Sequence, residues 1–212
     1  MEITLFALGL IGTAVFAASG AIVANEERFD LIGAVFLSVV AGLGGGTIVD
    51  LVSGVEPVRW VANSLPLWIA IGAGIAAFLI ARAAHLPEKT LNWVDAAGLA
   101  LFTAEGMERL MALGVNPATS VFLAAIGASG GGILRDTLAN RQPLVFSPET
   151  ELYVTAAIAG GLGYLAAHAL GAPGRAPMYA ALLLTFLVRA AGILFKLRVI
   201  GGRGPSGKTN AN

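Results

Sequence analysis

Residues 41–50 read AGLGGGTIVD, and this stretch lies inside a run of apolar residues long enough to cross a membrane. Three successive glycines are unusual there, because each costs about 1 kcal/mol in helix propensity relative to Ala. An aspartate at membrane depth is also costly and is read by default as functional. Two interpretations follow: a helix break that exposes backbone to a wet cavity, or a site of close helix packing.

The stretch occurs twice. A second copy, ASGGGILRD, occupies residues 128–136, and the two glycine triplets lie 86 residues apart. The same offset, without a gap, aligns further identical residues of the two halves. They are Gly44, Gly45, Gly46 and Asp50 with Gly130, Gly131, Gly132 and Asp136, Phe36 with Phe122, and Pro57 with Pro143. Chance matches of Gly are common in membrane segments, but aligned Phe, Asp and Pro indicate an internal duplication.

The composition indicates a membrane protein. Of the 212 residues, 57% are hydrophobic and 12% charged, and the mean hydropathy is +0.81, far from the composition of soluble domains. The 13 basic and 13 acidic residues balance, so a nucleic-acid surface is not expected. The chain has no Cys, which excludes disulfides and thiolate chemistry. We see no combination of nucleophile, base and orienting group, so we expect neither an enzyme nor a resident metal or cofactor.

Seven apolar runs are long enough to span a bilayer core about 30 Å thick, which needs roughly 20 residues per helix. They are residues 3–24, 31–52, 63–84, 91–113, 117–139, 151–170 and 177–199. The connections between them are short and hold most of the charges. No connection is large enough to offer a standard interface to a soluble partner.

Each copy of the repeat holds three spans. Because three is odd, the second copy must enter the membrane in the opposite orientation. The predicted fold is therefore all-α, with two inverted three-helix repeats and a seventh helix. Its parts are residues 1–86, 87–172, 173–200 and a disordered tail, 201–212, rich in Gly and polar residues. In such folds, interrupted helices of the two halves meet near the bilayer midplane and form a solute pathway.

The distribution of Lys and Arg predicts the orientation. One side of the predicted bundle carries Arg28, Arg82, Lys89, Arg135, Arg141, Lys196, Arg198, Arg203 and Lys208. The other side carries only Arg59, Arg109 and Arg175. We therefore expect a cytoplasmic C-terminus and an N-terminus on the outside.

The two aspartates are candidate pathway residues. Asp50 and Asp136 each follow the last glycine of a triplet by four residues, so each acid projects on about the same helix face as that glycine. The inversion would place one carboxylate in each vestibule, where it would attract cations. Alternatively, each Asp caps a helix or pairs with an Arg. Arg135 breaks the symmetry, because the first repeat has Val49 at its position.

We consider three further charged residues that lie inside predicted spans. Arg189 is near the middle of the seventh and should face the bundle interior, because a lipid-facing guanidinium would be very costly. It would act as a gate or barrier, or as an ion-pair partner of Asp50 or Asp136. Glu105 and Arg109 are four residues apart on the fourth span and are expected to pair.

The doubled motif resembles the prokaryotic members of the trimeric intracellular cation (TRIC) channel family. In that family GGGxxxD in the second span is echoed by GGGxxRD in the fifth; here these read GGGTIVD at 44–50 and GGGILRD at 130–136. The resemblance covers essentially the whole chain. It implies a homotrimer in the prokaryotic plasma (inner) membrane, with a pore in each protomer lined by kinked second and fifth spans.

On the matching positions, the resemblance implies that the glycine triplets, Asp50, Arg135 and Asp136 are pore elements, to which we add Arg189. The expected function is a channel for monovalent cations, chiefly potassium as the permeant ion, with membrane lipids around it. A transporter of small solutes such as glycine, working by alternating access, would use the same inverted repeats. A membrane assembly protein without any pathway is a further alternative.

Overall fold

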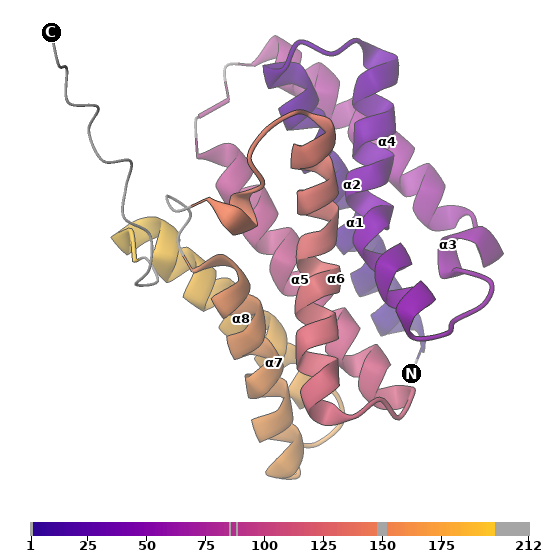
Figure 1. Ribbon diagram of the computed structural model, residues 1–212, viewed down its shortest axis with the longest axis vertical. Coiled ribbons are helices and arrows are strands. Elements are labelled where there is room, and N and C mark those ends of the chain that lie inside the picture. The colour runs from indigo at the N-terminus through magenta and orange to yellow at the C-terminus, as the bar shows by residue number, and fades with distance from the viewer. Residues whose placement is uncertain (1, 85, 88, 148–151, 198–212) are drawn as a thin grey trace, which may run out of the picture.

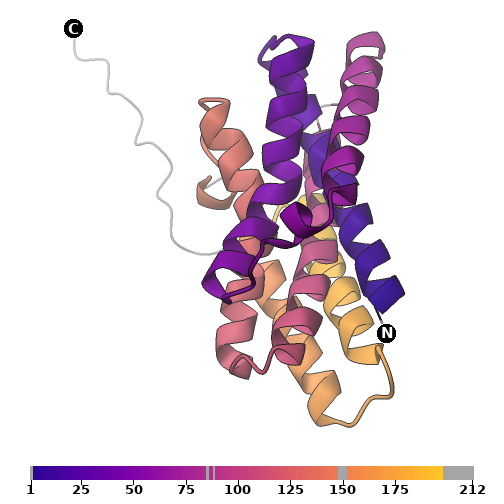
Figure 2. The ribbon, with the colours of Figure 1, turned by 90° about the vertical axis from the view of Figure 1, so that its right-hand side faces the viewer.

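The computed structural model describes residues 2–84, 86–87, 89–147 and 152–197. Within these residues the fold is all-helical, with eight α-helices and one short 3-10 helix. They are α1 (Glu2–Glu26), α2 (Leu31–Val52), α3 (Arg59–Ala62), α4 (Leu65–Ala83), α5 (Thr90–Ala112), α6 (Pro117–Leu138), η1 (Leu144–Phe146), α7 (Tyr153–Ala169) and α8 (Ala176–Phe195). The long helices lie roughly along the long axis of the molecule (Figure 1, Figure 2), and several are tilted, most clearly α8 in Figure 1. The predicted tail, residues 201–212, lies outside the described residues.

Local signals explain where the helices begin and end. Asp30 caps α2, because its carboxylate accepts a hydrogen bond from the backbone N of Gly33 at 2.7 Å. Asn116 caps α6 in the same way, and Pro117 follows as the first helical residue. Gly114, with φ +74°, supplies the left-handed backbone after the end of α5. Each predicted span therefore coincides with one long helix, with ends shifted by a few residues.

Five of these helices, α1, α2, α4, α6 and α8, are long and apolar enough to cross a membrane. The other two long helices do not show this by composition or length alone. α5 carries Asp95, Glu105, Glu108 and Arg109, and α7 has 17 residues. That α5 and α7 also span the membrane stays a prediction.

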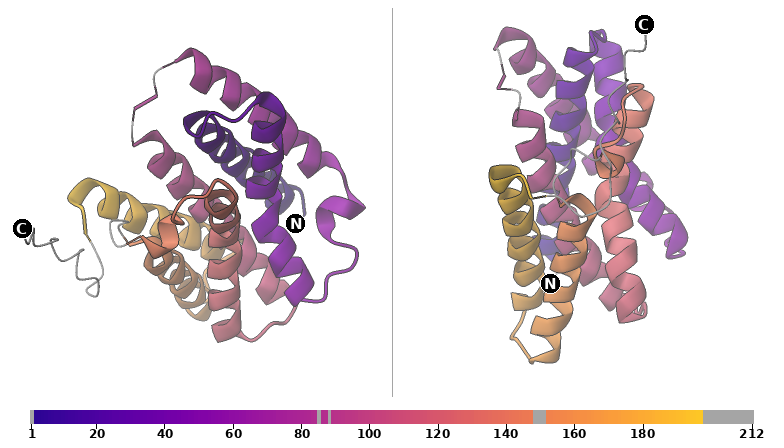
Figure 3. Two further views of the ribbon diagram at one scale, coloured as in Figure 1. Left: turned by 45° about the horizontal axis from the view of Figure 1, so that its top comes forward. Right: turned by 60° about the vertical axis from the view of Figure 1, so that its left-hand side comes forward.

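The helices pack as two groups: α1, α2 and α4 form one, and α5, α6, α7 and α8 form the other. α1 packs against α2, α4 and α5, while α6 packs against α2, α5 and α7. α8 lies beside α7 on one flank, and α4 lies on the opposite flank (Figure 1, Figure 3). The two groups meet where α2 packs against α6 and α1 packs against α5, and the pair α2 and α6 carries both glycine triplets.

The glycine triplets do not break their helices, so of the two interpretations drawn from the sequence, the helix break is wrong. α2 and α6 are helical at every residue through Gly44–Gly46 and Gly130–Gly132. The structure shows a packing reason instead. A Cβ placed on Gly45 would overlap the carbonyl oxygen of Gly127, and one placed on Gly131 would overlap that of Ala41. The middle glycine of each triplet thus lets the α2 and α6 backbones touch, a place we call the glycine crossing.

Candidate functional site

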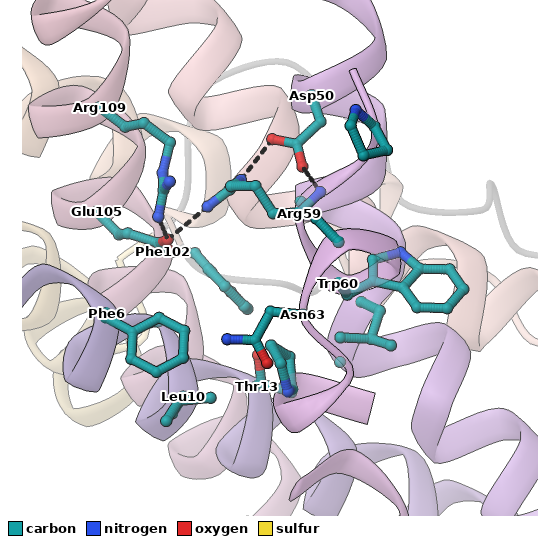
Figure 4. A pocket seen from close by; sticks show the side chains of 17 residues that line it. Phe6, Leu10, Thr13, Asp50, Arg59, Trp60, Asn63, Phe102, Glu105 and Arg109 are labelled. Carbon is teal, nitrogen blue, oxygen red and sulfur yellow. Dashed lines mark hydrogen bonds and ion pairs between the residues drawn. The ribbon is translucent and has the colours of Figure 1, made fainter. Parts of the chain in front are cut away.

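A pocket of about 270 Å³ lies beside α2 and reaches the glycine crossing at Gly46. We call it the Asp50 pocket. Its polar wall includes Asp50, Arg59, Asn63, Glu105 and Arg109, and its apolar wall includes Phe6, Leu10, Trp60 and Phe102 (Figure 4). A mostly apolar cavity with a few convergent polar groups is typical of a small-molecule site.

Two buried carboxylates and two guanidiniums form the charged part of this wall. Arg59 donates from Nε to Asp50 Oδ1 at 2.7 Å and from Nη1 to Glu105 Oε1 at 2.9 Å. Arg109 Nη2 donates to the same Glu105 oxygen at 2.6 Å. The predicted Glu105–Arg109 pair is therefore confirmed. The alternative in which Asp50 pairs with an Arg also holds, so its charge is not left free to attract cations.

The short helix α3 brings Arg59 to this site. Arg59 is its first residue, and its backbone N donates to Asp50 Oδ2 at 3.1 Å, so Asp50 also caps a helix start. Trp60 Nε1 donates to Thr47 Oγ1 at 2.9 Å and ties α3 to α2. The sequence alone does not single out Arg59, because it lies in a connection between two spans. Its position two residues after the repeated Pro57 is the only local signal.

A second charged cluster, the Asp136 cluster, surrounds Arg135. Arg135 donates from Nε to Asp136 Oδ1 at 2.7 Å and from Nη1 to Asp95 Oδ1 at 3.0 Å and Ser19 Oγ at 2.8 Å. The backbone N of Leu144, the first residue of η1, donates to Asp136 Oδ2 at 3.1 Å. Arg135 and Asp95 are fully buried. Arg135 and Asp136, neighbours in the motif, thus form an ion pair. Asp95, which lies outside the motif, is the second carboxylate that pairs with Arg135.

The last glycine of each triplet faces one of these guanidiniums. A Cβ on Gly46 would lie 3.8 Å from Arg59 Nη2, and a Cβ on Gly132 would lie 3.7 Å from Arg135 Nη2. The two charged clusters therefore stand at the two last glycines of the crossing. Asp50 and Asp136 do not meet; each belongs to its own cluster.

The first glycine of each triplet packs against a side chain of the partner helix. A Cβ on Gly44 would press on Leu134, and one on Gly130 would lie 3.1 Å from Ile48 Cδ1. Of the six predicted glycines, four therefore serve the α2–α6 contact. Only the last of each triplet borders a charged cluster.

Arg189 is fully buried on α8, so its predicted interior position is confirmed. Its guanidinium lies 5.0 Å from the centroid of the Tyr153 ring, a cation–π contact. The alternative in which Arg189 pairs with Asp50 or Asp136 is wrong, because those carboxylates pair with Arg59 and Arg135 instead. The Tyr153 hydroxyl would lie 3.2 Å from a Cβ on Gly132, so Arg189 adjoins the Asp136 cluster through Tyr153.

Among the described residues, no group of three or more His, Asp or Glu side chains is placed to hold a metal ion. The two clusters offer fixed charges and hydrogen-bond donors. Such an arrangement can orient or select a solute by its charge.

Comparisons with known proteins match almost the whole chain. A family model described as Glycine transporter matches residues 6–82 and 92–169. A TRIC trimeric intracellular cation channel orthologue from Rhodobacter sphaeroides, a crystal structure, is 36% identical, with a TM-score of 0.86, covering 92% of this chain and 100% of that one. The family resemblance drawn from the doubled motif is confirmed.

Two curated relatives also match most of this chain. A UPF0126 membrane protein of Deinococcus radiodurans is 38% identical over 182 residues, which is 85% of this chain and 84% of the relative. The UPF0126 inner membrane protein YadS of Escherichia coli is 34% identical over 194 residues, which is 91% of this chain and 93% of the relative.

Proposed function

The chain belongs to the family described as Glycine transporter, and from this premise and its likeness to a TRIC cation channel we propose that it is a channel for monovalent cations, chiefly potassium. It is a multi-pass protein, and its relative in Escherichia coli is named an inner membrane protein. The observation that carries the proposal is the Asp50 pocket, which reaches the glycine crossing from one side. A pathway needs such an aqueous approach to the point where the two halves meet.

We place one pore in each protomer, between α2 and α6. It runs from the Asp50 pocket past the last glycines of the two triplets to the Asp136 cluster. Among the described residues, Arg135 is fully buried, which supports a closed end of the pathway at that cluster. Conduction then requires that the Arg135–Asp95 ion pair, with 3.0 Å between Nη1 and Oδ1, breaks or that both side chains move out of the pathway.

The proposal includes the inverted repeats, residues 1–86 and 87–172, and seven spans with residues 173–200 as the last. Backbone details that recur at the offset of 86 support it. Gly54 and Asn140 both take a left-handed conformation, with φ of 71° and 55°. Val55 and Arg141, the next residues, donate their backbone N to the carbonyl oxygen five residues earlier, at 2.9 and 2.8 Å. If the halves share one fold in opposite orientations, α5 and α7 span the membrane as α1 and α4 do.

We also propose a homotrimer with its N-terminus outside and its C-terminus cytoplasmic. The matched structure from Rhodobacter sphaeroides is described as trimeric. Phe36 on α2 and Phe122 on α6, equivalent in the repeat, are 66% and 61% exposed. This outer apolar face of α2 and α6 suits contact with lipid or with further copies of the chain.

Single-channel recording in a planar bilayer under a potassium chloride gradient tests the channel. Discrete current steps that reverse near the potassium potential are expected, and Asp50→Asn should lower conductance or selectivity. A silent bilayer with the protein shown to be inserted would refute the channel. Unchanged currents in both Asp50→Asn and Asp136→Asn would remove the two acids from the mechanism.

A transporter of a small zwitterion such as glycine is the second candidate, and one observation favours it. The charges of Asp50 and Glu105 are balanced by Arg59 and Arg109, so the pocket offers both a guanidinium and a carboxylate to one solute. A pocket without net charge does not concentrate cations. This candidate predicts saturable glycine uptake without unitary currents, whereas an assembly protein without a pathway predicts no flux at all.

A further inference from the structure

We propose that Arg59 is the residue that determines which solutes reach the glycine crossing from the Asp50 pocket, because it cancels the negative charge of the acids there. The inference rests on the proposed function, since it presumes that solute passes the crossing. It assigns a selective role to a residue outside the doubled motif.

The position of Arg59 supports this role. Its guanidinium bridges α2 and α5 across the pocket, with Nε at 2.7 Å from Asp50 and Nη1 at 2.9 Å from Glu105 (Figure 4). The Arg59 side chain is 31% exposed, whereas those of Asp50 and Glu105 are only 3% and 6% exposed. An entering solute therefore meets the guanidinium before it meets either carboxylate.

Arg59 is also the spatial counterpart of Arg135. Each bridges two carboxylates, and the Nη2 atom of each lies nearly the same distance, 3.8 or 3.7 Å, from a Cβ placed on the last glycine of a triplet. Yet the repeat does not align them. At the offset of 86, Arg59 matches Val145 and Arg135 matches Val49. Two guanidiniums thus stand beside the last glycines of the two triplets although they come from different positions of the repeat. This indicates that a positive charge is needed at each of these glycines.

The charges of the pocket give the direction of the effect. Its lining holds two acids, Asp50 and Glu105, and two bases, Arg59 and Arg109, and no other charged residue among the described residues that line it. Arg59→Gln would change the net charge from zero to one negative. A unit charge about 12 Å from a passing ion, at an effective dielectric of about 20, changes the occupancy of that ion by about tenfold, or about 1.4 kcal/mol.

The experiment compares two solutes in the same proteoliposomes. Uptake of rubidium, a stand-in for potassium, and of glycine is measured for equal amounts of protein that elutes as one folded species. Arg59→Gln should raise the rubidium-to-glycine ratio about tenfold. Arg59→Lys keeps the charge and should stay within about twofold of wild type. Arg82→Gln is the matched control: it removes one charge from an exposed position on α4 outside the pocket lining.

A double variant guards against misfolding of Arg59→Gln, which leaves Asp50 short of a partner. Asp50→Asn with Arg59→Gln restores zero net charge without a stranded acid, so its ratio should return to the wild-type value. The inference is overturned if Arg59→Gln moves the ratio no more than Arg82→Gln does, or if the double variant alone moves it. Glycine uptake without rubidium uptake in wild type would refute the channel; the role of Arg59 would then hold if Arg59→Gln admits rubidium and be overturned if it does not. Uptake of neither solute would refute both proposals.

Discussion

Two neighbouring glycines of the first triplet should respond in opposite ways to the same substitution. In Gly45→Ala the new methyl group would overlap the carbonyl oxygen of Gly127 and lie 3.1 Å from the backbone N of Gly131. In Gly46→Ala the nearest atom outside its own helix would be Arg59 Nη2, at 3.8 Å, an ordinary van der Waals contact. Comparing the two variants therefore distinguishes a role in helix packing from a role in the solute pathway.

The expected magnitudes follow from two terms. Both substitutions gain about 1 kcal/mol of helix propensity. Gly45→Ala also forces two backbones apart, and neither can rotate away as a side chain would, so the cost lies at or above the upper end of the usual 1–3 kcal/mol for over-packing, about 3 kcal/mol. A gap of half an ångström or more between α2 and α6 would further weaken their dispersion contacts. We expect Gly45→Ala to lower the free energy of unfolding by about 2 kcal/mol and Gly46→Ala to raise it by up to about 1 kcal/mol.

Unfolding in a titration with SDS, followed by the fluorescence of the three tryptophans, measures these changes. Bilayer recordings of the same preparations measure conduction. Gly46→Ala should keep its stability but conduct less, because its methyl group narrows the end of the crossing beside Arg59. Equal stability of the two variants would refute the close approach of α2 and α6, and unchanged conduction in Gly46→Ala would take that glycine out of the pathway.

Three further predictions concern the charges. Asp136→Asn should cost about 3 kcal/mol of stability in the same titration, because it leaves the fully buried Arg135 with Asp95 as its one remaining carboxylate partner. Asp50→Asn should cost less, because its partner Arg59 is 31% exposed; equal costs would contradict this difference in burial between the two guanidiniums. Arg141→Gln should change stability by less than about 1 kcal/mol, because its ion pairs are exposed, and a larger loss would show that they belong to the core. Arg189→Ala should alter channel open probability in bilayer recordings, because its Tyr153 contact borders Gly132; identical gating would make Arg189 purely structural.

The sequence by itself determined the helices and the chemical character of the site. Apolar length, capping by Asp30 and Asn116 and glycines after helix ends are local, so each predicted span coincides with a long helix. The doubled GGG and Asp motif identified the helix pair that crosses at the centre. The Glu105–Arg109 pair, one helical turn apart, was equally predictable.

The tertiary structure alone decided which charges meet and what the glycines do. Arg59 reaches Glu105 across 46 residues of chain, and Arg135 reaches Asp95 across 40 and Ser19 across 116. Such partners depend on which helix faces are brought together, and no local pattern carries that information. The same holds for the triplets: in isolation three glycines predict a broken helix, but the contact between α2 and α6 offsets their poor helix propensity and keeps both helices continuous.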